Sequence, residues 1–337
     1  MPLPLAFIVC TEPGRLEKQS QILAKSIRTF GGKLKDTPIY SFHPRQGDPV
    51  APETLSGFAT LGVDHQQVVL NTKYHDYYLA NKPYVCDYAE RTIDAEILVF
   101  LDSDKCFFAE PAEFLLPNNY NIGLRVEYGR GIGSTGSQDI QDDYWQKLYQ
   151  TVGVEEERFV TTPIGNKKIR AYWNSGMVAV RRSAGIFQTW KNNFEQVMEA
   201  KIMPKQGNYM LEQSSLSATV CALQEDVFTF SPAYSYPLPL HNRLSPEFKL
   251  ASFDEIVSIH YFGLFYYRNW QKELDRIEQM DKKSVKYNWL RQTILDYDLD
   301  YKPISTKYYY LLKKIEKRLR QFNLKINLSE LIKPKNS

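Results

Sequence analysis

The sequence predicts an α/β fold, with a Rossmann-like, mixed, mostly parallel sheet flanked by helices. Short apolar runs at residues 5–10 and 97–101 have the length and composition of strands buried on both faces of a parallel sheet. Segments with a helical spacing of apolar residues lie between such runs, and this alternation is typical of parallel strands covered by helices. A chain of 337 residues is long enough to bury one large core of this kind.

The first hundred residues follow the strand–helix alternation. The first expected strand, residues 5–10, leads through the turn at 11–14 into a helix that ends at Gly31 and Gly32. The apolar face of this helix carries Leu16, Leu23, Ile27 and Phe30. The next expected elements are two strands and a helix with proline in its first turn, at 37–42, 66–70 and 83–92.

After residue 108 the expected elements are shorter. Strands are expected at 120–126, 177–180, 227–231 and 256–259, and helices at 184–200 and 212–223. A glycine-rich loop at 127–141 and a hairpin at 158–170 connect some of them. From Asn269 onward the chain is helical and charged, so we expect a catalytic domain at 1–270 and a helical, basic extension at 271–337.

Composition and charge narrow the class of protein. A formal net charge of +3 does not favour nucleic acid as a partner. The four cysteines have no paired spacing, which favours reduced thiols and a cytoplasmic location. No run approaches the roughly 20 apolar residues that span a bilayer, and no secretion signal is expected at the N-terminus.

The C-terminal segment, residues 302–337, carries ten Lys and Arg against two Glu. Apolar residues between Tyr308 and Phe322 fall at helical spacing. This helix is expected to pack on the domain or, alternatively, to lie on an anionic membrane surface with its lysines on the polar face.

The sequence Asp102-Ser103-Asp104 directly follows the apolar run 97–101. Ligands bind at the carboxyl ends of such strands in open α/β sheets. Two carboxylates one residue apart in a buried setting need a cation, and a hard divalent ion such as Mg²⁺ or Mn²⁺ fits, because it prefers oxygen ligands and leaves positions for phosphate oxygens. A helix cap is the structural alternative, but a cap needs one Asx residue rather than two.

Two kinds of enzyme carry aspartates in this position. A glycosyltransferase DxD motif holds a metal on the diphosphate of a sugar nucleotide, whereas a phosphohydrolase of the haloacid-dehalogenase type would use Asp102 as its nucleophile. The second motif normally has Thr or Val where this chain has Cys106, and it lies near the start of its domain. A further alternative is a catalytically silent nucleotide- or glycan-binding protein that docks on membranes through the basic tail.

Other polar residues at expected element ends are candidates for the same site. His260 is either a satisfied structural histidine or a third ligand for a metal that accepts imidazole, which favours Mn²⁺. Gly263 would let the backbone approach a phosphate closely. Lys82, before a proline-started helix, is either solvated or placed to hold a diphosphate.

Two short segments offer similar alternatives. Asn174-Ser175-Gly176 is either a turn or a set of hydrogen-bonding groups for a sugar or phosphate. Glu212-Gln213 either favours the dipole of its helix or lies in the site.

Five short motifs, in their order along the chain, resemble the motif set of the glycosyltransferase A-type fold. They are LDSD (101–104), WNSG (173–176), EQ (212–213), LPLHN (238–242) and HYFG (260–263). They are most similar to family 8, the glycogenin-like enzymes, over about residues 5–270. Each motif is short, but their order and spacing make the set specific.

The resemblance implies transfer of a sugar from a nucleotide sugar, a uridine diphosphate (UDP) sugar, to a glycan or glycoconjugate. It implies a metal held by Asp102, Asp104 and His260. Glu212 and Gln213 would face the anomeric carbon and the acceptor. The implied donor-binding residues are Thr11, Glu12, Lys82, Asp102, Ser103, Asn174, Ser175, Gly176, Gly263 and Arg268.

Two positions depart from the family pattern. Glu212 stands where the family usually has Asp, and Arg268 stands two positions after the place of the family's phosphate-binding lysine. These departures leave open whether the anomeric configuration is retained or inverted.

Overall fold

The described part of the chain contains one large sheet, two small sheets and eight α-helices. The structure is a computed structural model that describes residues 3–205, 210–267, 269–275, 281, 283–297, 299, 308, 311, 312 and 315. The large sheet contains β1 (Leu3–Cys10), β2 (Ile39–His43), β3 (Val63–Gln67), β4 (Ala95–Leu101), β6 (Ile122–Leu124), β9 (Met177–Arg181) and β10 (Val227–Thr229). One small sheet contains β5 (Lys105–Phe107), β11 (Tyr236–Pro237) and β12 (Ser258–His260). The other contains β7 (Phe159–Thr161) and β8 (Lys168–Arg170). The helices are α1 (Arg15–Phe30), α2 (Pro52–Thr60), α3 (Asn81–Thr92), α4 (Asp142–Val152), α5 (Ile186–Glu199), α6 (Leu211–Ala222), α7 (Trp270–Asp275) and α8 (Val285–Asp296).

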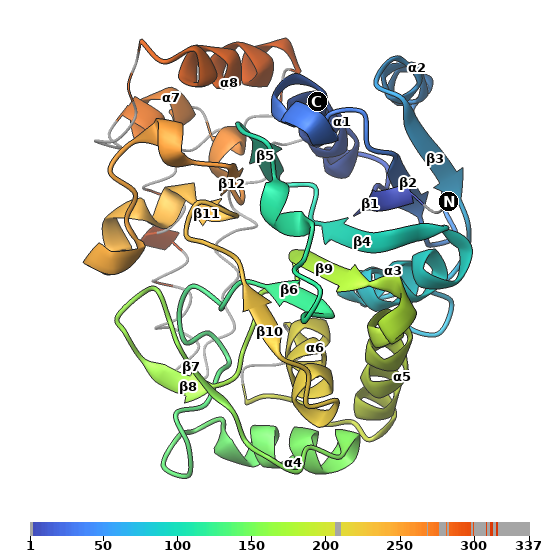
Figure 1. Cartoon of the computed structure of the whole chain (residues 1–337), viewed down its shortest axis with the longest axis vertical. Coiled ribbons are helices and arrows are strands. Elements are labelled where there is room, and N and C mark those ends of the chain that lie inside the picture. The colour runs from blue at the N-terminus through green and yellow to red at the C-terminus, as the bar shows by residue number, and fades with distance from the viewer. Residues whose placement is uncertain are drawn as a thin grey trace.

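The large sheet has the order β10-β6-β9-β4-β1-β2-β3 (Figure 1). Strand β9 runs antiparallel to both of its neighbours, and the other neighbouring pairs in this sheet are parallel. The prediction of a mixed, mostly parallel sheet is therefore confirmed.

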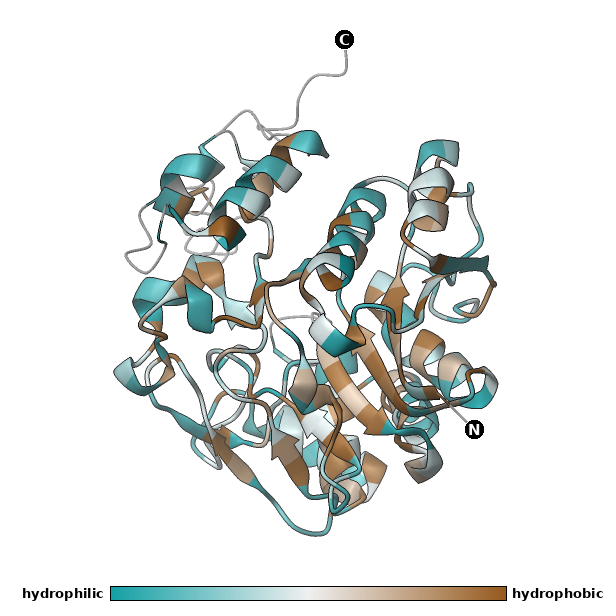
Figure 2. Ribbon diagram, turned by 45° about the horizontal axis from the view of Figure 1, so that its top comes forward, coloured by the Kyte–Doolittle hydropathy of each residue, from teal (hydrophilic) through white to brown (hydrophobic). Residues whose placement is uncertain are grey.

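The core lies on both faces of this sheet, because successive side chains of each strand point to opposite faces. Leu5, Phe7 and Val9 of β1 pack with residues of α1 and α2, whereas Ala6 and Ile8 pack with α3, α5 and α6. Hydrophobic residues accordingly concentrate on the central strands (Figure 2). Each large apolar side chain buried in this way contributes about 1.5–3 kcal/mol.

The structure corrects two details of the predicted elements. The third strand is Val63–Gln67 rather than residues 66–70, because it is an edge strand with half-exposed polar residues and therefore has no apolar run. The apolar stretch up to residue 108 divides at the turn 102–104, and Lys105–Phe107 pairs with β12 in a separate sheet.

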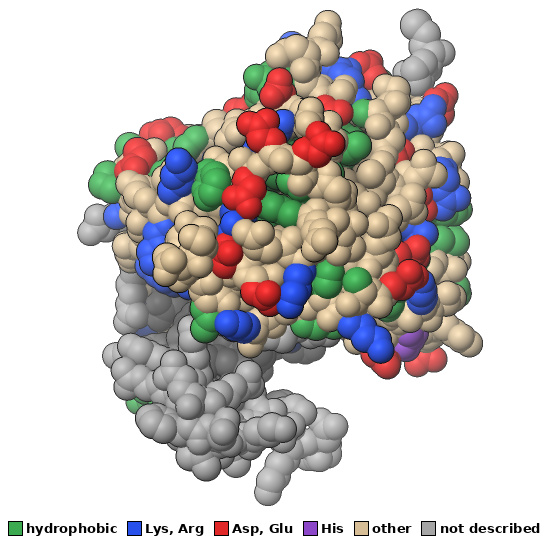
Figure 3. Space-filling model, turned by 90° about the horizontal axis from the view of Figure 1, so that it is seen from below, with side chains coloured by type: hydrophobic (Ala, Val, Ile, Leu, Met, Phe, Trp, Pro, Cys, Tyr) green, Lys and Arg blue, Asp and Glu red, His purple; other side chains and the backbone are tan. Residues whose placement is uncertain are grey.

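Helix α8, in the predicted extension 271–337, packs on the domain. Tyr287, Leu290 and Ile294 of α8 share a core cluster with Ile22 and Cys106. Most of residues 302–337, where the basic helix is predicted, lie outside the described residues. None of the described helices is long and apolar enough to cross a membrane. On the face shown in Figure 3, acidic and basic side chains are interspersed, with small hydrophobic areas between them.

Candidate functional site

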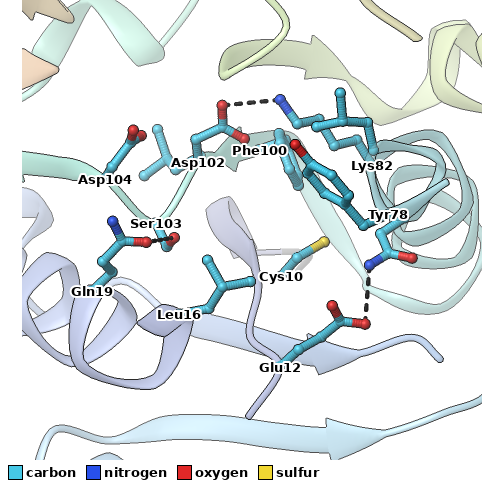
Figure 4. Close-up of a pocket in the computed structure, with 13 residues that line it drawn as sticks. Cys10, Glu12, Leu16, Gln19, Tyr78, Lys82, Phe100, Asp102, Ser103 and Asp104 are labelled. Atoms are coloured by element: carbon cyan, nitrogen blue, oxygen red, sulfur yellow. Dashed lines mark hydrogen bonds and ion pairs between the residues drawn. The ribbon is translucent and has the colours of Figure 1, made fainter. Parts of the chain in front are cut away.

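A cavity of about 210 Å³ lies at the carboxyl ends of β1 and β4, where the sequence predicts the site. Five predicted site residues line it: Glu12, Lys82, Asp102, Ser103 and Asp104 (Figure 4). The remaining lining residues are Cys10, Leu16, Gln19, Tyr78, Leu79, Asn81, Phe100 and Leu101. The lining therefore combines apolar side chains with polar ones, called the polar wall below, from segments far apart in the sequence.

Lys82, in the first turn of α3, is the positive centre of the polar wall. Its Nζ lies 2.9 Å from Asp102 Oδ2 and 3.8 Å from Glu212 Oε1. Burial works against the charged form, but attraction by Asp102 and Glu212 outweighs it and raises the pKa of Lys82. The side chain therefore stays cationic and holds two carboxylates at the edge of the sheet.

Glu212 lies in the first turn of α6 and is fully buried. Its Oε2 accepts a hydrogen bond of 2.7 Å from Tyr77 Oη, and its Oε1 accepts one of 3.3 Å from Ser175 Oγ. Burial raises the pKa of Glu212, although Lys82 and the Tyr77 hydroxyl oppose this shift. Glu212 is thus a rigidly held carboxyl group behind the lysine that lines the cavity.

Glu127 fixes the orientation of two predicted site amides. Its Oε2 accepts hydrogen bonds from Asn174 Nδ2 at 2.9 Å and from Gln213 Nε2 at 3.0 Å. Gln213 Oε1 accepts from the backbone N–H of Ser175 at 3.1 Å, and Asn174 Oδ1 accepts from that of Gly176 at 3.0 Å. Because backbone N–H groups only donate and a carboxylate only accepts, both amides have one possible orientation.

His260 faces Asp104, with 3.2 Å between Nε2 and Oδ2. Tyr128 Oη donates to the Ser235 carbonyl at 2.7 Å, so its single proton is used there. His260 Nδ1 must then donate to Tyr128 Oη, 3.0 Å away, which leaves a lone pair on Nε2. Burial lowers the pKa of His260, and this favours the neutral ring.

The backbone after His260 holds the ring in place. Phe262 adopts a φ of 52°, which an L-residue rarely does, and its ring stacks on His260 at 3.8 Å between centroids. A lone pair facing a carboxylate oxygen is repulsive unless a cation lies between them. The Asp104–His260 pair therefore fits a divalent ion or a proton.

The structure brings together only part of the predicted metal set. Asp104 Oδ1 is buried and has no hydrogen-bond partner in the described part of the chain, which leaves it available as a ligand. Asp102 instead directs Oδ2 to Lys82. Over the residues that the structure describes, no three His, Cys, Asp or Glu side chains are grouped closely enough to hold a metal ion.

Other predicted donor residues lie around this centre. Glu12 is held by Arg45, with 2.6 Å from Nε to Oε1 and from Nη2 to Oε2, and accepts a third bond from Asn81. Thr11 is buried, and its hydroxyl bonds to Ser20 and Ser41 rather than lining the cavity.

Three further predicted residues differ in placement. Gly176 packs so closely against Asp102 that a Cβ there would overlap the carboxylate. Gly263 follows Phe262 and begins a short 3-10 helix, outside the cavity lining. Arg268 lies outside the described residues.

Sequence reasoning missed several residues of the site. Tyr77, Glu127 and Tyr128 position predicted residues, and only their distant hydrogen-bond partners show this. Lys105 did carry a signal, since it is a lone charge between Asp104 and the apolar residues Cys106-Phe107-Phe108.

The sequence model of the Rhodobacterales glycosyltransferase domain matches residues 7–224, well over half of the chain. The protein belongs to this glycosyltransferase family. Family membership confirms the predicted enzyme class and favours sugar transfer over phosphate hydrolysis. The sheet described above confirms the predicted mixed, mostly parallel α/β fold.

Several solved glycosyltransferases have a similar structure, whereas no curated protein sequence matches. The bifunctional glycosyltransferase WbbM is 11% identical at a TM-score of 0.48, with 87% of this chain and 51% of that chain covered. GlyE of Streptococcus pneumoniae is 10% identical at 0.47, with coverage of 87% and 64%. The galactosyltransferase LgtC, in complex with donor and acceptor sugar analogues, is 13% identical at 0.42, with coverage of 85% and 99%. The chain thus spans between half and two thirds of the length of WbbM and GlyE.

Proposed function

We propose that this glycosyltransferase transfers a sugar from a nucleotide sugar, a UDP sugar, to a glycan or glycoconjugate acceptor, with Mn²⁺ or Mg²⁺ as cofactor. The observation that carries the proposal is the cavity at the carboxyl edge of the sheet, lined by Asp102, Asp104 and Lys82. The motif resemblance to family 8 enzymes supports the same donor class.

Two of the three predicted ligands, Asp104 and His260, lie together and could hold a divalent metal. Asp104 Oδ1 is buried without a partner among the described residues, and His260 Nε2 lies 3.2 Å from Asp104 Oδ2. Asp102 directs Oδ2 to Lys82, and its other oxygen could supply a further ligand. We assign the metal to Asp104 and His260 with Asp102. When bound, the metal neutralises charge on the leaving nucleoside diphosphate.

The chain's own residues supply the remaining electrostatics. Lys82 lines the cavity as a cation and faces charge that develops on the departing diphosphate. Its ion pairs with Asp102 and Glu212 fix its position before substrate binds, so little reorganisation is needed during transfer.

Glu212 and Gln213 are buried behind Lys82 and Ser175 and do not belong to the residues that line the cavity. We assign to them the side of the site that faces the anomeric carbon and the acceptor. Their fixed hydrogen bonds to Tyr77, Ser175 and Glu127 support this role, because a group that orients a sugar must itself be held rigidly.

The test is a turnover assay with a panel of UDP sugars and oligosaccharide acceptors, in which both the transferred sugar and free nucleoside diphosphate are measured. Wild type should transfer a sugar only when a divalent metal is present. Asp104→Asn should lose at least about a hundredfold in rate, since metal and oxyanion contacts contribute factors of this size. Asp143→Asn, on the exposed surface of α4, is the matched control and should keep full activity.

Equal turnover in Asp104→Asn and wild type would refute the proposed site. Hydrolysis of phosphate monoesters through a phosphorylated Asp102 would refute the proposed reaction.

We also propose a cytoplasmic location, with the basic C-terminal helix in peripheral contact with membranes. The supports are the unpaired spacing of the cysteines and the surplus of Lys and Arg after residue 301. Flotation with anionic liposomes, comparing the full chain with one that ends at residue 301, tests the contact. Equal flotation of both chains would contradict it.

A further inference from the structure

Lys105 is a fully buried lysine whose ammonium has no hydrogen-bond partner among the described residues. Buried charged groups are almost always paired, because losing water without gaining a partner is costly. The side chain therefore lowers the stability of the fold as it stands, and it needs an explanation outside packing.

The position of Lys105 places its ammonium beside the predicted metal ligands. Lys105 is the first residue of β5 and is the antiparallel partner of His260 in β12. Directly opposed residues on antiparallel strands project to the same face of a sheet. The carboxylates of Asp104, Asp102 and Glu127 all lie within electrostatic reach of the Lys105 ammonium.

The Lys105 ammonium has carboxylates near it but no direct partner among the described residues. None of these carboxylates comes within hydrogen-bond distance of Nζ, so their attraction leaves its donors unused.

The adjacent residues Asp104 and Lys105 thus each have one buried polar atom without a hydrogen-bond partner among the described residues. These atoms are the acceptor Asp104 Oδ1 and the donor Lys105 Nζ. They do not pair with each other. A metal–diphosphate group would satisfy both at once, since the carboxylate oxygen binds the cation and the ammonium donates to a phosphate oxygen. Lys82 is held by Asp102 and Glu212, whereas the donors of Lys105 Nζ have no partner among the described residues, so Lys105 can add a second cation for the diphosphate.

We propose that Lys105 is a second phosphate-binding cation of this site and donates to the diphosphate of the donor beside Asp104. The proposal rests on the proposed function, in that it names how the same site holds its nucleoside diphosphate. It predicts that part of the diphosphate affinity persists without a metal ion.

The experiment measures binding of inorganic pyrophosphate, UDP and uridine by calorimetry, in EDTA and with Mn²⁺. The variants are Lys105→Met, which keeps the length of the side chain without its charge, and Lys105→Gln, which stays polar. Lys147→Met, at an exposed position on α4, is the matched control for the change in net charge. Thermal unfolding of each variant shows that it is folded.

We expect wild type and Lys147→Met to bind pyrophosphate and UDP in EDTA, weakly but measurably. Both Lys105 variants should bind them about tenfold or more weakly in EDTA and in Mn²⁺, because a charge-assisted hydrogen bond is lost. Binding of uridine, which has no phosphate, should not change. Lys105→Met should also raise Tm, because it removes an unpaired buried charge.

Equal affinities for pyrophosphate in wild type and both Lys105 variants would overturn the proposal, and so would a complete loss of wild-type binding in EDTA. In either case, UDP binding that still requires Mn²⁺ would leave the proposed function standing. Absence of UDP binding to wild type under both conditions would instead refute the proposed function itself.

Discussion

The hydroxyl group of Tyr77 is the most informative single atom to remove, because it links the start of α6 to the buried carboxyl of Glu212. Tyr77 Oη donates to Glu212 Oε2 at 2.7 Å and accepts from the backbone N–H of Leu211 at 3.0 Å. In Tyr77→Phe the ring keeps its stacking on Phe194, at 6.2 Å and 15°, so only the two hydrogen bonds are lost.

The expected cost follows from the two buried groups left without partners. Each unsatisfied buried donor or acceptor costs about 1–3 kcal/mol, so the two together should lower the free energy of unfolding of Tyr77→Phe by about 2–6 kcal/mol. The Tyr77 hydrogen bond also lowers the pKa of Glu212, so its loss should raise that pKa further. Turnover should fall by about tenfold or more, because Glu212 loses one of the contacts that fix it.

Urea unfolding followed by tryptophan fluorescence measures the change, with Tyr261→Phe as the matched control. Tyr261 is fully buried, and its hydroxyl has no partner in the described part of the chain. The control should therefore change the free energy of unfolding by less than about 0.5 kcal/mol or raise it. If the free energy of unfolding falls by the same amount in both variants, the Tyr77–Glu212 hydrogen bond does not stabilise the fold as argued.

Three further predictions test other parts of the account. Gly176→Ala should reduce turnover at least about tenfold, because the added Cβ would push the Asp102 carboxylate away from Lys82. The control Gly129→Ala has open space at its Cβ and should keep its turnover, so equal rates for the two variants would contradict this prediction. Glu127→Gln should lower turnover and cost about 1 kcal/mol in urea unfolding, since Asn174 and Gln213 lose their shared carboxylate; an unchanged KM and kcat would argue against it. The pKa of Asp139 lies at about 2, because hydrogen bonds from Gln141 N–H, Arg130 and Thr135 outweigh its burial. Its contribution is therefore complete above about pH 4 and lost as the pH falls toward 2. Asp139→Asn should lower the free energy of unfolding at pH 7 by about 2 kcal/mol and flatten its pH dependence below pH 4, as measured by thermal unfolding across pH; an unchanged profile would count against this assignment.

The central strand and its polar end could be predicted because local sequence determines them. Residues 97–101 are continuously apolar, and Asp102 follows at once, so strand and site appear in the same short stretch. Lys82 and Glu212 could be predicted as candidates because each lies at the start of a recognisable helix.

Pairings between distant segments could not be predicted in this way. Lys105 continues into the apolar residues after the turn, and only its pairing with His260, 155 positions later, shows that it begins a separate strand. Glu127 lies in a loop whose composition says nothing of its partners Asn174 and Gln213. The partner of a buried polar group depends on the tertiary structure and has no periodic signal in the sequence.

We expect the cavity beside Asp102, Asp104 and Lys82 to bind a nucleoside diphosphate together with a metal ion. Calorimetric titration of wild type and Asp104→Asn with UDP, with and without Mn²⁺, measures this binding. Mn²⁺ should strengthen UDP binding to wild type by at least about tenfold, and Asp104→Asn should lose this gain. Identical UDP affinities for both proteins with and without Mn²⁺ would contradict it.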